Sequence, residues 1–524
     1  MHPSKPARVH GRAPGILAAF AALVLLASGC TAGGSPQAQP KGSLSPSPLP
    51  KTSAAASPSP ANLRRFYRQK VSWHDCRGHD RCMRMKVPLE YAHPDGATIS
   101  VAVLKVPAAD PGQRIGALVV NPGGPGGSGL DYAANTSSYF GAPLHQHFDI
   151  VGFDPRGVGE STPIHCESTA QLDTFVAADP DPDTKAEIKH SDALLHQLGE
   201  GCVKHSGRLT AHISTREVAK DMDILRAVLG DAKLTYFGAS YGTFLGATYA
   251  GLFPHRVGRM VLDGALNPAL SSMKMDLVQA HGFEVALRSY ARHCVDAGGC
   301  FLGKTVDQAT ERIRQFLADV EAHPLPGSSG RKLTIGNAVL GIWAPLYSRS
   351  YWPLLDNALK AAFNGQGAAL LALSDAYTSR GPNGYLDNSL EALYAVNCLD
   401  RDDSIPSLQV PKYIPRFEKA SPTFGAIFAF GLSSCSTWPV HTHRGPHAIH
   451  APGAPPILVI GTTRDPATPL AWARALANQL DSGVLIKRDG DGHTGYHHGN
   501  ACVDDTVEAY LVSGKVPAHH EVDC

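Results

Sequence analysis

The sequence predicts an α/β fold in which helices cover both faces of a mostly parallel β-sheet. Two observations support this prediction. Short apolar runs, of the kind found in buried parallel strands, alternate with amphipathic helical patterns along much of the chain. The region 271–450 instead carries helical patterns and few strand-like runs, so we predict a mainly helical insertion there. With 524 residues, 43% hydrophobic and 18% charged, the chain can bury a large core.

The first 62 residues are expected to lie outside the folded domain. A basic start and the apolar run "GILAAFAALVLLA" predict a signal peptide over 1–29. The run ends in "LASGC", which resembles a bacterial lipoprotein signal, so Cys30 is the candidate lipidation site; an ordinary secretory signal is the alternative. The segment 30–62 is rich in Ser, Pro and Ala, which predicts a tether. Both alternatives predict an exported protein.

Two blocks, 63–270 and 451–524, are predicted to form the α/β core, separated by the insertion 271–450. In the first block, strands at 85–92 and 98–108 flank an "HPDG" turn. Strands and helices then alternate, which favours parallel strands joined by crossover helices. The later core elements are predicted strands at 115–120, 147–154, 259–264, 455–461 and 483–492, and helices at 215–230 and 470–480. Helices are predicted in the insertion at 306–323 and 351–365.

The cysteine count predicts disulfide bonds. Of 11 cysteines, ten remain when Cys30 is set aside, and an even number in an exported protein indicates five disulfides. Zinc binding is the alternative, but the chain has no C-x-x-C pair. Local spacing favours the pairs Cys76–Cys82, Cys294–Cys300 and Cys502–Cys524.

Ser240 lies where a predicted strand becomes a predicted helix. The strand begins at Leu234, the helix ends before Pro254, and Gly238-Ala-Ser-Tyr-Gly242 between them fits the pattern G-x-S-x-G. Glycine on either side removes side chains that would clash in so sharp a turn. The turn presents the serine hydroxyl at a helix N-terminus, which favours developing negative charge. A packing turn with an incidental serine is the alternative.

A serine nucleophile needs a base, and late strands supply candidates. Asp465 follows the strand at 455–461, and His493 follows the next one. The order Ser240, Asp465, His493 is that of an α/β-hydrolase. His493 and His497 also have the i, i+4 spacing of a metal pair, but the HExxH pattern is absent, so no metal site is predicted. The nearby rivals for acid and base are Asp489, Asp491, His497 and His498.

An oxyanion hole is expected from two places. One donor is the backbone N–H of Tyr241, next to the nucleophile. The other comes from the loop "NPGGPGGSG", where Gly123 and Gly124 expose bare backbone. A phosphate-binding loop is the alternative, but the GK[ST] ending of such a loop is missing. The predicted chemistry requires no cofactor.

Several motifs together resemble those of a known family. They are "NPGGPGGSG", "FDPRGVGES", "DMDILRAVLG", "YFGASYGTFLGATYA", "RMVLDG" and "GTTRDPATPLAWARALA". The chain from about residue 70 to 524 is similar to the actinobacterial tripeptidyl aminopeptidases, exported relatives of the prolyl aminopeptidases among α/β-hydrolases. This resemblance implies a triad of Ser240, Asp465 and His493, and a cap formed by the insertion. It implies that Arg156 of "DPRG" braces loops.

The combined prediction is an exported, lipid-anchored serine aminopeptidase that releases di- or tripeptides from peptide or protein N-termini. A carboxylesterase with the same triad is the main alternative, and a non-catalytic surface lipoprotein is a remote one. The net charge of +1 gives no indication of nucleic-acid binding. A monomer is expected, with membrane contact only through the lipid anchor.

An aminopeptidase must hold the substrate's α-ammonium, and a buried cation needs a carboxylate partner. The segment "VNCLDRDD" in the insertion supplies Asp400, Asp402 and Asp403 close to Cys398. Asp400 is the first choice because it is nearest the cysteine, and the family resemblance implies a similar Cys-x-Asp here. A solvated acidic loop is the alternative.

Overall fold

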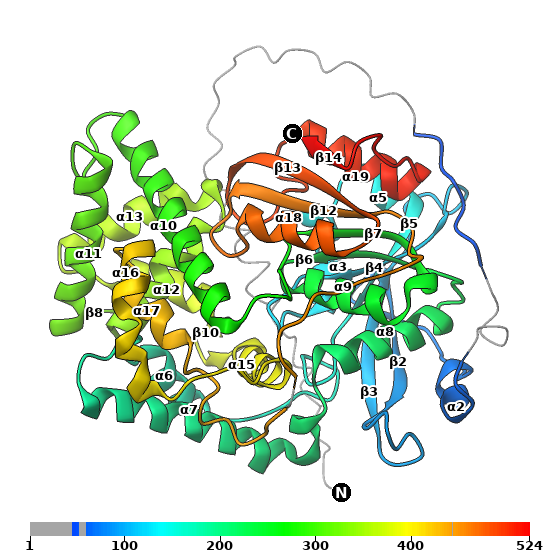
Figure 1. Ribbon diagram of the computed structural model, residues 1–524, viewed down its shortest axis with the longest axis horizontal. Helices are drawn as coiled ribbons and strands as arrows, with labels where there is room; N and C mark the ends of the chain where they lie inside the picture. The colour runs from blue at the N-terminus through cyan, green and yellow to red at the C-terminus, as the bar shows by residue number, and fades with distance from the viewer. Residues whose placement is uncertain (1–43, 52–58, 443) are drawn as a thin grey trace, which may run out of the picture.

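The structure is a computed structural model that describes residues 44–51, 59–442 and 444–524. The predicted signal peptide, Cys30 and most of the predicted tether lie outside these residues. A sheet with covering helices forms one part of the molecule, and a helical region lies beside it (Figure 1). Within the described ranges, no helix is both long and apolar enough to cross a membrane.

The described residues contain one large sheet of ten strands. Its order is β1-β2-β3-β5-β4-β6-β7-β12-β13-β14, and the strands from β5 to β14 run parallel. The predicted mostly parallel sheet is therefore confirmed, with an antiparallel edge formed by β1 to β3. The strands are β1 (His74–Cys76), β2 (Asp80–Pro88), β3 (Thr98–Val106), β4 (Gly116–Asn121), β5 (Phe148–Phe153), β6 (Leu234–Ala239), β7 (Val257–Asp263), β12 (Ile457–Arg464), β13 (Gly483–Asp491) and β14 (Glu521–Asp523).

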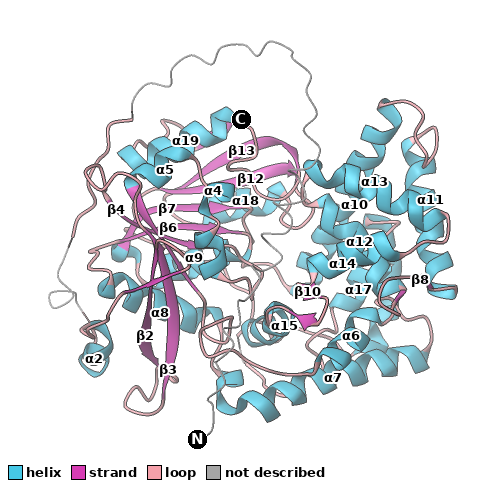
Figure 2. Ribbon diagram, turned by 180° about the vertical axis from the view of Figure 1, so that it is seen from behind, coloured by secondary structure: helices cyan, strands magenta, loops and turns pink. Residues whose placement is uncertain are grey.

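Helices cover both faces of this sheet (Figures 1 and 2). Side chains of α3, α5 and α19 pack on one face, and those of α8, α9 and α18 pack on the other. All residues of β4, β5 and β6 are buried, which explains their continuous apolar runs. The core helices are α2 (Arg64–Tyr67), α3 (Gly129–Ala134), α4 (Thr136–Tyr139), α5 (Ala142–His147), α8 (Thr215–Val228), α9 (Tyr241–Leu252), α18 (Leu470–Gln479) and α19 (Ala501–Ser513).

The inserted segment forms a helical layer with a hydrophobic cluster of its own. Two short strand pairs interrupt it, β8 (Leu325–Pro326) with β9 (Lys332–Leu333) and β10 (Arg380–Gly381) with β11 (Gly384–Tyr385). The inserted helices are α10 (Ser272–Asp296), α11 (Val306–Ala322), α12 (Ile335–Leu346), α13 (Trp352–Phe363), α14 (Ala368–Tyr377), α15 (Ser389–Asp400), α16 (Ile414–Ala420) and α17 (Gly425–Gly431).

Chain order and position in space differ at two places. Helices α6 (Thr169–Ala177) and α7 (Lys185–Ser206) precede the insertion in sequence but lie beside its helices (Figure 1). Ile188 of α7 belongs to the hydrophobic cluster of the insertion. Conversely, Ala392, Ala395 and Leu399 of α15 pack into the core of the sheet layer. The two layers therefore share elements rather than meeting at one boundary in the chain.

Five disulfides connect the ten cysteines of the described residues. The three pairs predicted from local spacing are confirmed, and Cys398 is also bonded, to Cys435. The fifth pair, Cys166–Cys202, joins the loop after β5 to α7. The Cys398–Cys435 bond ties the end of α15 to the segment that follows α17, so it holds the acidic "DRDD" loop in place.

We predict that thiol titration of the mature domain, denatured without reductant, will detect close to no free thiol per chain. The reason is that all ten cysteines beyond Cys30 are paired. The same sample after reduction provides the control and should report these ten. Several free thiols in the unreduced sample would contradict the pairing.

Candidate active site

Ser240 lies between the end of β6 and the start of α9, as the sequence predicts. Its φ of 55° is in the region that favours glycine, so the turn is strained. A Cβ at Gly238 would lie 2.3 Å from the carbonyl oxygen of Gly242, and a Cβ at Gly242 would lie 2.8 Å from that of Asn121. Only glycine fits at both positions. The Ser240 N–H donates to the Asp263 carbonyl at 2.8 Å.

Asp465 and His493 follow the parallel strands β12 and β13 and meet at the carboxyl edge of the sheet. The Nδ1 atom of His493 lies 2.9 Å from Oδ2 and 3.0 Å from Oδ1 of Asp465. The carboxylate is 2% exposed and also accepts the N–H groups of Ala467 and Thr468, at 2.9 and 2.8 Å. These bonds hold the acid opposite the imidazole, as predicted.

The second imidazole nitrogen is available for proton transfer. His493 Nε2 is buried, and no described residue forms a hydrogen bond with it. Burial alone would lower the pKa of His493, but the Asp465 and Asp263 carboxylates together outweigh it and the pKa is raised. A Cβ at Gly264 would lie 3.2 Å from His493 Cε1, and the preceding residue, Asp263, binds the Ser240 N–H. Ser240 and His493 therefore flank the Asp263–Gly264 peptide.

Three of the four rival acids and bases have other side-chain partners. Asp489 and Asp491 both pair with Arg464, at 2.8 and 2.7 Å. His498 Nε2 lies 2.9 Å from the Thr494 hydroxyl, and burial lowers the pKa of His498 to about 4. Among these acids, the one within hydrogen-bond distance of the His493 imidazole is Asp465.

The glycine loop after β4 packs directly against the nucleophile turn. Gly123 has a φ of 96°, and a Cβ there would lie 2.9 Å from the Tyr241 nitrogen and 2.8 Å from Ser240 Cβ. The Gly123 N–H already donates to the Asn121 side chain at 3.0 Å. No hydrogen bond among the described residues uses the N–H of Tyr241 or of Gly124. Gly123 thus permits the close approach, and the other two amides are available to an oxyanion.

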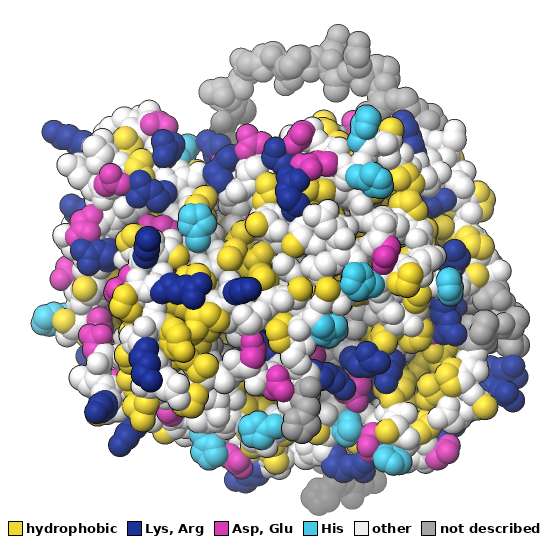
Figure 3. Space-filling view, in the orientation of Figure 1, with side chains coloured by type: hydrophobic (Ala, Val, Ile, Leu, Met, Phe, Trp, Pro, Cys, Tyr) yellow, Lys and Arg dark blue, Asp and Glu magenta, His cyan; other side chains and the backbone are white. Residues whose placement is uncertain are grey.

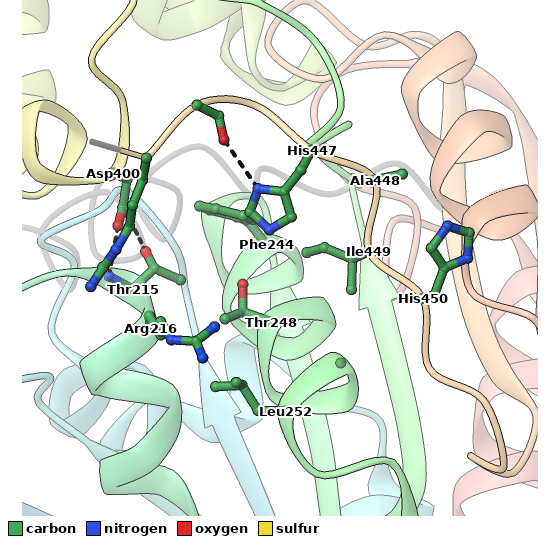
Figure 4. A pocket seen from close by; sticks show the side chains of 13 residues that line it. Thr215, Arg216, Phe244, Thr248, Leu252, Asp400, His447, Ala448, Ile449 and His450 are labelled. Atoms are coloured by element: carbon green, nitrogen blue, oxygen red, sulfur yellow. Dashed lines mark hydrogen bonds between the residues drawn. The ribbon is translucent and has the colours of Figure 1, made fainter. Parts of the chain in front are cut away.

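Asp400 caps a core helix. Its Oδ1 accepts the Thr215 N–H at the start of α8 (2.9 Å), and its Oδ2 accepts the Thr215 hydroxyl. Burial raises the pKa of Asp400 to about 6. Asp400 lines a cavity of 410 Å³ together with Arg216 and Arg444. Figure 4 shows Asp400 beside Thr215, and it shows Phe244 of α9, which also lines the cavity. None of the three triad residues lines that cavity. The predicted amine role of Asp400 stays a prediction.

Three inserted helices contact the loops that carry the candidate residues. The carbonyl of Tyr347, just after α12, accepts the His493 N–H at 2.8 Å. Gln279 of α10 donates to the backbone of the acid loop at 2.7 Å. A Cβ at Gly126 in the oxyanion loop would lie 2.5 Å from the Ser389 carbonyl at the start of α15. The insertion thus supports the site directly.

Sequence reasoning missed one residue that joins these parts. Asp263 ends β7 and is 1% exposed. Its Oδ1 accepts the Gly495 N–H at 2.8 Å, and its Oδ2 accepts the Tyr496 N–H at 2.9 Å. The sequence did contain a signal for Asp263, namely the acidic residue at the end of "RMVLD". Binding and catalytic sites of α/β proteins form at the carboxyl ends of buried parallel strands, and Asp263 stands at such an end.

These features define a class of protein. A strained serine between strand and helix, a later acid and a later histidine at the same sheet edge make the chain a serine hydrolase with the α/β-hydrolase fold. Family models agree: residues 116–321 match the one described as alpha/beta hydrolase fold, and residues 421–524 match the one described as TAP-like protein.

Individual relatives indicate which serine hydrolases this chain resembles. Serine protease Hip1 of Mycobacterium tuberculosis is 38% identical over 471 residues, covering 86% of this chain and 90% of that protein. Carboxylesterase B of the same species is 36% identical, covering 85% and 88%. Tripeptidyl aminopeptidase of Streptomyces lividans is 31% identical, covering 87% of each. The chain belongs to this family of α/β-hydrolases. The five disulfides, together with these relatives, indicate that the protein is exported.

Replacing the nucleophile should abolish catalysis without unfolding the protein. For Ser240→Ala we expect kcat to fall on the order of 10⁵-fold or more, because the attacking oxygen is lost. Hydrolysis of a chromogenic substrate and labelling by a fluorophosphonate probe measure the effect. Ser138→Ala, at an exposed position, is the control and should behave as wild type. Activity of pure Ser240→Ala protein within tenfold of wild type would refute the assignment.

Gly123→Ala tests the oxyanion loop. The added methyl group would meet the Ala239 carbonyl oxygen, Ser240 Cβ and the Tyr241 nitrogen, so we expect kcat to fall by about 10²- to 10³-fold, as when one oxyanion donor is lost. The matched control is Gly78→Ala, since Gly78 also has a positive φ, 86°, but no neighbour would contact the new Cβ. Equal losses of kcat in the two variants would mean that backbone strain, not the site, is responsible.

Proposed function

We propose that the protein is an exported, lipid-anchored aminopeptidase that releases di- or tripeptides from substrate N-termini through an acyl-enzyme. The observation that carries the proposal is the buried Asp465–His493 pair beside the Ser240 turn, in which His493 Nε2 forms no hydrogen bond with any described residue. Two relatives that match most of the chain are named as a serine protease and as a tripeptidyl aminopeptidase, and these names support peptide substrates.

The mechanism follows from the roles of these residues. Ser240 Oγ attacks the carbonyl carbon of the scissile bond while His493 Nε2 takes the hydroxyl proton. The N–H groups of Tyr241 and Gly124 stabilise the oxyanion, since both are without acceptors among the described residues. His493 then donates its proton to the leaving amine, and Asp465 stabilises the imidazolium. Water, activated by His493, hydrolyses the acyl-enzyme and releases the short peptide.

The insertion is proposed to act as the cap that limits how much of the substrate enters. Support comes from its contacts with all three catalytic loops, through Tyr347, Gln279 and Ser389. A cap that closes one end of the cleft admits only a short N-terminal segment beyond the scissile bond.

A carboxylesterase is the second candidate, and the relative named Carboxylesterase B favours it. The same triad cleaves esters, so the residues of the site do not discriminate. The discriminating feature is the substrate's free amine, because an ester substrate needs none.

The remaining proposals concern location and partners. Lipidation of Cys30 would hold the enzyme at the outer face of the membrane, and the Ser/Pro-rich tether would give it reach. Peptide and protein N-termini are the proposed partners of a monomeric enzyme, with no role for nucleic acid. The net charge of +1 supports this, and on the face shown in Figure 3 basic and acidic side chains are intermixed.

The substrate test compares tripeptidyl p-nitroanilides with a free or an acetylated N-terminus, and p-nitrophenyl butyrate. An aminopeptidase should show much higher kcat/KM for the free amine, and Asp400→Asn should remove that preference by abolishing the carboxylate charge. The expected loss for free-amine peptides is about 10- to 100-fold greater than for acetylated ones.

Asp403→Asn is the matched control, because Asp403 belongs to the same loop and also caps a helix, α10, through the Ser272 N–H at 2.7 Å. It does not line the Asp400 cavity. An equal loss on both peptide types in Asp400→Asn would remove Asp400 from the amine site. Strong wild-type activity on acetylated peptides, or on the ester alone, would favour the carboxylesterase.

A further inference from the structure

Asp263 occupies the strand position between the nucleophile and the acid. In the register of the sheet, Asp263 on β7 is opposite Ala239 on β6 and Ile460 on β12. Its carbonyl accepts the Ser240 N–H at 2.8 Å. The backbone carbonyl of Asp263 therefore holds Ser240, the proposed nucleophile, in place.

The side chain of Asp263 holds the other half of the site, the loop that carries His493. The two carboxylate oxygens accept the N–H groups of Gly495 and Tyr496, one each. Every amide from 493 to 497 has a specific acceptor: the Tyr347 carbonyl for His493, Asp465 for Thr494, Asp263 for Gly495 and Tyr496, and Asp504 for His497.

The loop needs this support because its backbone is strained. Thr494 and His497 have φ values of 70° and 61°, which non-glycine residues rarely adopt. Such conformations persist only where the surroundings determine them. Two of the five supporting bonds come from Asp263, so its carboxylate contributes more of them than any other acceptor group.

We propose that Asp263 is a positioning residue for catalysis, which sets the nucleophile turn through its carbonyl and the His493 loop through its carboxylate. This inference rests on the catalytic roles proposed for Ser240 and His493. It does not depend on whether the substrate is a peptide or an ester.

The negative charge of Asp263 acts on His493 in addition to the hydrogen bonds that position its loop. Burial raises the pKa of Asp263 to about 7, and the ionisable groups that face it are His493, Asp465, Arg488 and Tyr132. When ionised, Asp263 helps to raise the pKa of His493, after the larger contribution of Asp465. The same charge stabilises the imidazolium that forms when His493 takes the serine proton. Asparagine lacks the charge and offers only one acceptor for two amides.

Asp263→Asn is the first test. We expect kcat to fall about 10- to 100-fold, as for a small misplacement of a catalytic group, with KM changed less than about threefold. The acid limb of kcat/KM should move to lower pH, because His493 acts as a base only when neutral and loss of a nearby anion lowers its pKa. A purely structural role would not move that limb.

Asp154→Asn is the matched control. Asp154 follows strand β5 of the same sheet, is 1% exposed, and also accepts two backbone amides, from Leu130 and Glu160, at 3.2 and 2.8 Å. Its replacement should cost stability in a similar way but leave the acid limb at the wild-type pH. An unmoved acid limb in Asp263→Asn, or a kcat within about threefold of wild type, would overturn the proposal.

Gly495→Ala tests the same contact from the loop side and serves if Asp263→Asn does not fold. A Cβ at Gly495 would lie 2.7 Å from Ile460 Cγ2 and 3.5 Å from Asp263 Oδ1, so the loop must shift against the strand ends that carry Ile460 and Asp263. The rate of fluorophosphonate labelling should fall at least about tenfold. Labelling at the wild-type rate would overturn the proposal. Absence of labelling in the wild type would instead refute the proposed serine hydrolase activity, on which this inference depends.

Discussion

The N–H of Ser240 donates to the carbonyl of Asp263, and this bond joins the nucleophile turn to the adjacent strand β7. The turn is so crowded that Gly238 and Gly242 leave no room for a Cβ, and Gly123 of the oxyanion loop abuts it from the other side. A strained serine needs such packing to keep its conformation. The close packing that creates the strain therefore also brings the oxyanion amides to the nucleophile.

Support for the site extends into both layers of the molecule. Tyr347 and Gln279 of the insertion bind the histidine and acid loops, while Asp400 caps the core helix α8. Arg156, which the family resemblance implied is a loop brace, is fully buried and donates to both oxygens of Asp221 on α8 at 2.7 Å. Through Tyr347 and Gln279, the inserted layer is therefore part of the framework that holds the candidate site.

Local patterns predicted eight of the ten strands in the large sheet, the serine turn and the candidates Asp465 and His493, because each signal lies within a few residues of a buried strand. The short edge strands β1 and β14 were not predicted, and β2 spans Asp80–Pro88 rather than the predicted 85–92. Three disulfides were predicted for the same reason, since their cysteines are close in the chain. The rival Asp489 could be set aside only in the structure, where it pairs with Arg464. The capping role of Asp400 was not predicted, because its partner Thr215 lies 185 positions away.

The sequence by itself determined the fold class, the candidate nucleophile and the order of the candidate acid and base. Apolar periodicity, glycine spacing and turn chemistry are local properties, so they can be recognised without knowing which segments meet. Only the tertiary structure decided that Asp263 holds the Gly495 and Tyr496 amides and that Tyr347 holds His493. Those contacts join segments more than 140 positions apart. The Asp263 contacts arise because parallel strands bring their carboxyl ends to one edge of the sheet, and the Tyr347 contact arises because the insertion packs on that edge.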